Sequence, residues 1–258
     1  MLREGGDEAR RALDESGFVV VRGLLPLAGR DALAEVFRRH EHDGIATSAE
    51  VLFTHEPPPL DAPGMHRLMR QWLNPHRRAA PWTTRDLAST LRPRVEAWLG
   101  EPAVLFQDLL LEKREEHRAF PWHQDLPFWP VDRPIGLVVW TPIDPATERS
   151  GGLLLAEGSH RAGVGPAINL HTGAPQGGAG EPLDLTPYPV ARPALDPGDA
   201  IVFHPLLWHA SPPNHAGHPR RAWASTWLGA SARWSHARAP RHPLCRIIED
   251  GARVSPLP

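Results

Sequence analysis

Short runs of apolar residues, each bounded by Pro, Gly or Asp, dominate the chain from residue 101 onward. The runs cover residues 104–111, 136–143, 152–156, 200–207 and 222–228. Each has the length of one β-strand, and several short strands separated by turn residues are typical of an antiparallel sandwich or barrel. We therefore expect a mainly β core over about residues 101–235.

The first hundred residues have a mixed pattern. A β-branched run at residues 18–21 predicts a short strand, and helical spacing of apolar residues predicts helices near residues 33–40 and over residues 84–99. Residues 163–192 are rich in Gly and Pro, which predicts a long loop of the kind that often forms a lid. Since no repeat or linker is evident, we expect one domain over residues 1–258, with a helical part at about 1–100 packing on the β core.

Composition excludes several classes of protein. The chain has 28 Lys and Arg against 30 Asp and Glu, so its net charge of −2 favours neither nucleic acid nor an anionic membrane as a partner. Cys245 is the only cysteine, which rules out an intrachain disulfide and fits a reducing compartment. No apolar run approaches the roughly 18 residues that a membrane helix needs. We expect a soluble cytoplasmic protein, a monomer or a homodimer.

His123 and Asp125 lie in the segment FPWHQDLP, residues 120–127. On an extended backbone, residues two apart point to the same face, so this imidazole and carboxylate can reach one atom while Gln124 points away. Histidine is the commonest metal ligand. The pair therefore predicts two ligands of a metal ion, and a third ligand must come from elsewhere.

His209 offers that third ligand, in the segment HPLLWHAS at residues 204–211. We expect the apolar run before it to be a buried strand, with His209 at the end of that strand and His204 as a structural residue. Two His and one carboxylate, with open coordination positions, form the ligand set of non-haem Fe(II) oxygenases. Zinc usually takes a different set, and one cysteine cannot provide thiolate ligands.

Arg220 begins the next apolar run after His209. Its guanidinium can hold a carboxylate by two parallel hydrogen bonds, which Lys cannot match. A cosubstrate with two carboxylates would fit this arrangement, one end on the metal and the other on the arginine. Arg221 would take over this role if the strand register slipped by one residue.

Taken together, these motifs resemble the phytanoyl-CoA dioxygenase family of Fe(II)/2-oxoglutarate-dependent oxygenases. The likeness covers most of the chain and keeps the motif order. The segments are LDESGFVVVRGL at 13–24, FQD at 106–108, WHQDLP at 122–127, WTPID at 140–144, SGGL at 150–153, EGSHR at 157–161, HPLLWHAS at 204–211 and RRA at 220–222. Where family members continue with Lys and a Pro-Pro-Gly-like turn, this chain has KREE at 113–116, which leaves the role of Lys113 open.

The resemblance implies a double-stranded β-helix, a cupin-like jelly roll that is mainly β with flanking helices. It implies that His123, Asp125 and His209 hold Fe(II), that Arg220 pairs with the far carboxylate of 2-oxoglutarate, and that O2 is the oxidant. Further cosubstrate contacts are expected from Gln107, Trp140 and Ser211. Because halogenases of this kind have a small residue in place of the carboxylate, Asp125 favours hydroxylation. The products from 2-oxoglutarate would be succinate and CO2.

The expected substrate is a small-molecule metabolite or natural-product intermediate. Trp122, Phe128 and Trp129 flank the metal motif and are candidates to line an apolar substrate pocket, and Arg161 is a candidate to bind a polar group of the substrate. Two alternatives remain open at this point: an inactive jelly-roll metal-binding or sensor protein, and a non-redox metalloenzyme on the same fold.

Overall fold

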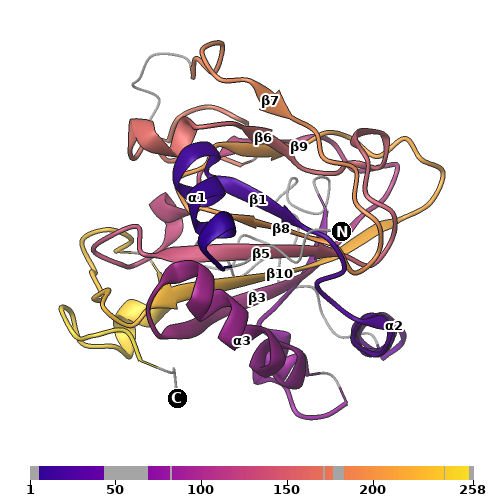
Figure 1. The fold of residues 1–258 in the computed structure, drawn as a ribbon, viewed down its shortest axis with the longest axis horizontal. Coiled ribbons are helices and arrows are strands. Elements are labelled where there is room, and N and C mark those ends of the chain that lie inside the picture. Colours follow the sequence, from indigo (N-terminus) through magenta and orange to yellow (C-terminus); the bar gives the residue numbers. More distant parts are fainter. Residues whose placement is uncertain are drawn as a thin grey trace.

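The structure, a computed structural model, describes residues 6–43, 69–81, 83–170, 172–176, 183–240 and 242–255. Two antiparallel sheets face each other (Figure 1). The six-stranded sheet contains, in spatial order, β1 (Phe18–Val21), β8 (Ala200–Phe203), β5 (Gly136–Pro142), β10 (Arg220–Gly229), β3 (Ala103–Lys113) and β2 (Arg70–Leu73). The four-stranded sheet contains β4 (Phe120–His123), β9 (His209–Ser211), β6 (Leu154–Ala156) and β7 (Val190–Ala191). This arrangement confirms the predicted jelly roll.

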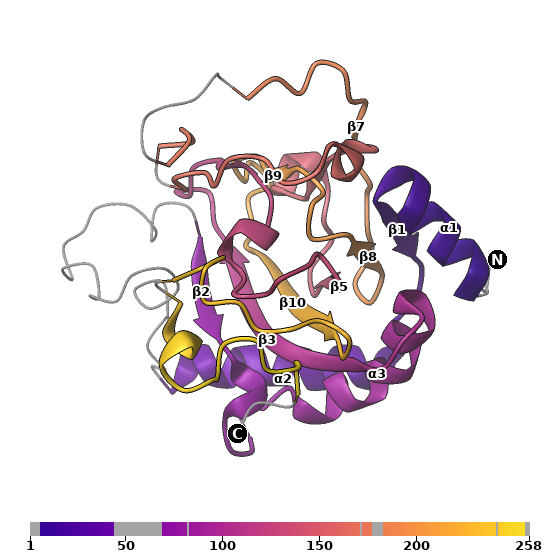
Figure 2. The same cartoon turned by 90° about the vertical axis from the view of Figure 1, so that its left-hand side faces the viewer.

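Three α-helices of the described chain pack on the outer side of the six-stranded sheet. They are α1 (Gly6–Ser16), α2 (Leu27–His42) and α3 (Arg85–Leu99), and Figure 2 shows α2 and α3 along that side. Short 3-10 turns are η3 (Pro75–Arg77), η4 (Leu126–Phe128), η5 (Glu148–Ser150), η6 (Ser159–Ala162) and η7 (Pro243–Arg246). None of the described helices combines the length and the apolar character that crossing a membrane requires.

The six-stranded sheet separates two apolar clusters. Trp72, Trp223 and Trp227 are fully buried in the outer cluster, which the helices cover. The inner cluster lies between the sheets, and β10 contributes only the small Ala222 and Ala224 to its middle part. Since alternate residues of a strand face opposite sides, β10 places its bulk outside and leaves space inside.

A β-bulge divides the long strand β3. Gln107 pairs with Thr226 and Leu105 pairs with Trp227, so Phe106 is the extra residue. Gln107 lines the interior and Phe106 belongs to the inner cluster, so two consecutive side chains face inward. The bulge therefore lets the strand bury an apolar floor while still directing an amide into the interior.

The strand predicted over residues 200–207 ends earlier than expected. β8 stops at Phe203, the amide of Leu207 donates to the carbonyl of His204 in a turn, and the chain crosses to the other sheet. Pro205 has no N–H for a ladder, which accounts for the break. His209 thus begins β9 and does not end the preceding strand, which corrects the sequence-based expectation.

Gly136, at the start of β5, allows a close backbone approach. A Cβ at this position would lie 2.5 Å from the carbonyl oxygen of Trp227. Because that oxygen belongs to the ladder and cannot move alone, Gly136→Ala is expected to lower the free energy of unfolding by about 1–3 kcal/mol. Thermal denaturation measures this loss. Gly29→Ala is the control, since its Cβ would meet nothing nearer than 3.6 Å and should leave the midpoint unchanged or slightly higher; equal midpoints for both variants would refute the close approach.

Candidate functional site

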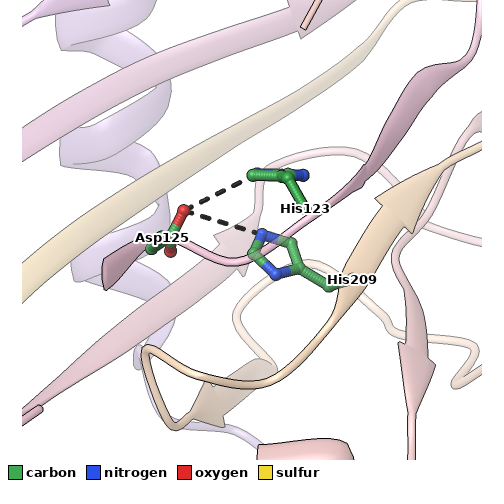
Figure 3. A group of neighbouring side chains, drawn as sticks. All are labelled: His123, Asp125 and His209. Atoms are coloured by element: carbon green, nitrogen blue, oxygen red, sulfur yellow. Dashed lines mark ion pairs between the residues drawn. The ribbon is translucent and has the colours of Figure 1, made fainter. Parts of the chain in front are cut away.

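His123, Asp125 and His209 converge between the sheets (Figure 3). His123 ends β4 and is paired in register with His209 at the start of β9, while Asp125 caps η4 with helical backbone angles. The Nε2 atoms of His123 and His209 lie 3.6 and 3.8 Å from Asp125 Oδ1. One ligand atom from each residue falls within 4.8 Å of the others, which brings the three predicted ligands together.

Backbone carbonyls fix both imidazoles. His123 Nδ1 lies 2.9 Å from the Pro121 carbonyl oxygen, and His209 Nδ1 lies 2.9 Å from that of Leu207. A carbonyl only accepts, so each Nδ1 carries a proton, and in the neutral form of the ring the lone pair is on Nε2, which lies toward Asp125. This second contact on the far nitrogen is the usual support of a metal-binding histidine.

The charges of the three residues suit a cation. Burial alone would raise the pKa of Asp125, but the positive charge available on His209 and the contact with His123 lower it. Burial, and then the proximity of His123, lower the pKa of His209 to about 4. At neutral pH the site therefore combines a carboxylate with a neutral imidazole at His209, which are the forms that bind metal.

Two buried basic side chains lie at another part of the interior. Arg220 and Lys113 are paired in register and are 1% and 0% exposed. Arg220 Nη2 donates to the Gly151 carbonyl at 2.9 Å and to Ser211 Oγ at 3.3 Å, while Lys113 Nζ donates to Ser211 O at 2.8 Å and Oγ at 3.0 Å. Ser211 thus joins the two side chains.

Neither side chain of this basic pair forms an ion pair within the described part of the chain, although the charge of Asp144 acts on Arg220. Arg220 Nε and Nη1 are buried without a hydrogen-bond partner there. Burial lowers the pKa of Arg220 to about 10, and burial followed by the charge of Arg220 lowers the pKa of Lys113 to about 6. Buried cations with unused N–H groups are costly unless an anion joins them. The pair is therefore built to receive a carboxylate or a similar group.

Lys113→Met is expected to stabilise the ligand-free protein. The pKa of Lys113 falls from 10.5 to about 6 on folding, so between these values the unfolded chain binds more protons and acid destabilises the fold. The gain in the free energy of unfolding from Lys113→Met should thus be greatest, and constant, below about pH 6, and should vanish above about pH 10.5. Urea titrations of both proteins across this range measure it; a gain that is independent of pH would contradict a depressed pKa.

The neighbouring predicted residues have distinct positions. Arg221 faces the other way, and its Nε and Nη2 form a fork with Asp144 at 2.8 and 2.7 Å. Arg221 is therefore engaged elsewhere, and the register places Arg220 inside. The Arg220 guanidinium lies 5.2 Å from the centroid of the Trp140 ring, which forms part of the cavity wall.

One open cavity connects the metal-ligand triad with Arg220. Its lining contains Gln107, Trp140 and Ser211, the side chains that the family resemblance implied as further cosubstrate contacts. It also contains residues that the sequence did not single out: Met69, Gln71, Leu109, Leu111, Phe120, Val138, Leu153, Phe203, Ala210, Ala224 and Thr226. Thr226 follows the inward alternation of β10, so the pattern could have identified it. Met69 directly precedes the short strand β2 and Gln71 belongs to it. This strand has no alternating pattern in the sequence that would have pointed to either residue.

The four side chains proposed from the sequence as substrate contacts lie outside this lining. Trp122 packs against a separate small cluster, and Trp129 is buried against Phe106. Phe128 packs on the inner core, and Arg161 is exposed. Proximity to His123 along the chain does not by itself direct a side chain toward the metal ligands.

Gln124, which lies between His123 and Asp125 in the chain, forms side-chain hydrogen bonds to two neighbouring loops. Its Nε2 donates to the carbonyls of Leu206 at 2.7 Å and Gly163 at 3.0 Å, and its Oε1 accepts from the Gly165 amide at 2.7 Å. The side chain points away from the ligand face, as predicted. It ties the His123–Asp125 segment to the turn before His209 and to the start of the long loop.

Comparison with known proteins agrees with this geometry. A family model described as Phytanoyl-CoA dioxygenase (PhyH) matches residues 13–222. The 1-deoxypentalenic acid 11-beta-hydroxylase of Streptomyces arenae is 27% identical over 232 residues, covering 79% of this chain and 73% of its own length. The L-proline trans-4-hydroxylase of Streptomyces griseoviridis is 24% identical over 184 residues, covering 63% and 67%.

Solved structures share the fold. The non-heme alpha-ketoglutarate-dependent carbocyclase SnoK from nogalamycin biosynthesis superposes with a TM-score of 0.75 at 15% identity, covering 100% of this chain and 98% of that one. EctD from S. alaskensis, crystallised with 2-oxoglutarate and 5-hydroxyectoine, gives a TM-score of 0.68 at 19% identity, covering 100% and 90%.

Proposed function

The chain belongs to the phytanoyl-CoA dioxygenase family, and on this premise we propose that it is a single-domain Fe(II)- and 2-oxoglutarate-dependent oxygenase that hydroxylates a small molecule. One observation carries the proposal. The same cavity is lined by the His-Asp-His triad and by Arg220, whose Nε and Nη1 are buried without a hydrogen-bond partner in the described chain, and Ser211 joins Arg220 to Lys113 behind the lining. A metal ion would bind to the triad, and a dicarboxylate would bring the anion that the buried basic side chains lack.

The residues fit both groups by the chemistry of their donors. His123, Asp125 and His209 would hold Fe(II), leaving positions open as in other sites with two His and one carboxylate. The unused N–H groups of Arg220 would hold the distal carboxylate of 2-oxoglutarate, and the negative charge of that carboxylate would favour the protonated form of the neighbouring Lys113. When bound, iron and 2-oxoglutarate supply the oxidation by dioxygen, with succinate and CO2 as products.

The chain's own side chains bind, orient and exclude water. Trp140, Leu111 and Leu153 line the cavity with apolar surface, which keeps the carboxylate-binding end out of bulk solvent and strengthens its ion pairs. Asp125 provides the carboxylate ligand that halogenases of this kind lack, which favours hydroxylation. The hydroxylases among the relatives act on small molecules, by their names, and support a metabolite or natural-product intermediate as substrate.

Anaerobic addition of Fe(II) and 2-oxoglutarate tests the proposal. The wild type should develop the weak visible charge-transfer band of the iron chelate, and His123→Ala should not. Absence of the band in the wild type, or its persistence in the variant, would overturn the assignment. A band without succinate release across candidate substrates would instead favour a binding or sensor role.

A further inference from the structure

The inner face of the six-stranded sheet has a charged end and a neutral polar end. Along β10 the inward residues run from Arg220 through Ala222 and Ala224 to Thr226, and Gln107 of β3 pairs with Thr226. Arg220 and Thr226 are six residues apart, which corresponds to roughly 20 Å of strand. The Arg220 side chain reaches back along the strand, because its guanidinium lies 5.2 Å from the Trp140 ring and Trp140 pairs with Ala224, so Gln107 and Thr226 lie one inward position beyond that level.

The neutral end shares its position along the sheet with the metal-ligand triad. Thr226 pairs with Val138 of β5, and Val138 pairs with Phe203 of β8. The Phe203 ring in turn contacts His209, with 4.8 Å between ring centroids. A molecule lying beside the metal would thus meet this row of the sheet, where its reacting C–H group must be held.

Gln107 and Thr226 have hydrogen-bonding capacity to spare. Neither side chain bonds to another group of the described chain, and both line the cavity. Thr226 is only 4% exposed, so its hydroxyl meets the cavity and little bulk water. Buried polar groups in folded proteins nearly always have a partner, which here must enter from the cavity.

The cavity-lining neighbours of this pair on the six-stranded sheet are apolar. Val138 pairs with Thr226, Phe203 pairs with Val138, and Leu109 is the next inward residue of β3. A charged group placed here would lose its hydration without an opposite charge, whereas an alcohol, ether or ketone oxygen would find a donor and an acceptor.

Resting on the proposed function, we infer that Gln107 and Thr226 bind a neutral hydrogen-bonding group of an otherwise apolar substrate. This assigns Gln107 to the substrate and not to the cosubstrate. The two charges of 2-oxoglutarate are already matched, one by the metal and one by the pair of Arg220 and Lys113.

Cosubstrate titration separates the two assignments for Gln107. With anaerobic Fe(II) protein, the visible band gives the dissociation constant of 2-oxoglutarate. Gln107→Leu and Thr226→Val should keep this constant within about twofold, because an amide or hydroxyl that does not contact 2-oxoglutarate contributes nothing to its binding. An increase above about fivefold in Gln107→Leu would overturn the assignment and return Gln107 to the cosubstrate.

Probe binding tests the class of substrate. Cyclooctanol, cyclooctanone, cyclooctanecarboxylate and cyclooctylammonium share one ring and differ in a single group, and their effect on the band of the Fe(II)·2-oxoglutarate protein reports binding. The two neutral probes should bind at least about tenfold more tightly than the charged ones. Thr226→Val should weaken the neutral probes by between about twofold and tenfold.

Thr141→Val is the matched control. Thr141 lies on the outer face of β5, opposite Trp223, and its hydroxyl is buried without a partner in the described structure. The Thr141→Val substitution should leave the binding of all four probes unchanged. Equal or tighter binding of a charged probe, no response to any of the four, or an equal loss in Thr141→Val overturns the inference. Failure of the proposed function shows earlier and separately, as a missing band before any probe is added.

Discussion

Asp125→Ala is expected to lower Fe(II) affinity by more than about 100-fold and to abolish 2-oxoglutarate turnover. Asp125 supplies the only carboxylate of the triad, and removal of a direct ligand should exceed the 10–100-fold typical for outer partners. Metal competition titration and succinate release measure the two effects.

The control for this substitution is Asp184→Asn. Asp184 is exposed, so its loss removes a similar charge without touching the cavity. It should retain the metal affinity and the turnover of the wild type. If Asp125→Ala bound Fe(II) as tightly as Asp184→Asn, the triad would not be the metal site.

Arg220→Gln is expected to raise the dissociation constant of 2-oxoglutarate by at least about 30-fold, a loss of about 2 kcal/mol. The guanidinium is buried, and its two unpartnered nitrogens, Nε and Nη1, are the donors that a carboxylate would occupy. Glutamine lacks both the charge and the fork. Fe(II) affinity should stay close to that of the wild type, since Arg220 is not a ligand.

The adjacent arginine provides a sharp comparison. Arg221 donates to both oxygens of Asp144 on the other side of the strand, so Arg221→Gln should keep the 2-oxoglutarate constant within about twofold. It should lower thermal stability slightly, because a half-buried ion pair is lost. If the two variants were equally impaired in cosubstrate binding, the register that places Arg220 inside would be wrong.

The metal-ligand triad and Arg220 were predictable because their positions follow from short local patterns. A His-x-Asp segment, a His after an apolar run and an Arg at the start of the next run are visible along the chain. The helix α3 and the strands β3, β5 and β10 also follow the predicted periodicity.

Other features depended on contacts that no local pattern contains. The strand break at Pro205 moved His209 into the second sheet, yet the turn still brings it beside His123. The bulge at Phe106 depends on the pairing with β10. The joining of Lys113 and Arg220 by Ser211 needs residues separated by about a hundred positions, and for the same reason Met69 and Gln71 were not foreseen as cavity residues.

The strand β10 gives the enzyme two independent surfaces. Its outward tryptophans pack under the helices, while its inward Ala222 and Ala224 belong to the inner cluster and Ala224 lines the cavity. Changes of side-chain size at Ala224 would alter the room for a substrate while leaving Trp223 and Trp227 in their places. A family that needs many substrates from one scaffold can vary the inward, cavity-facing surface of this strand and keep the outward surface that packs under the helices. The strand would therefore be a practical starting point for altering substrate choice by design.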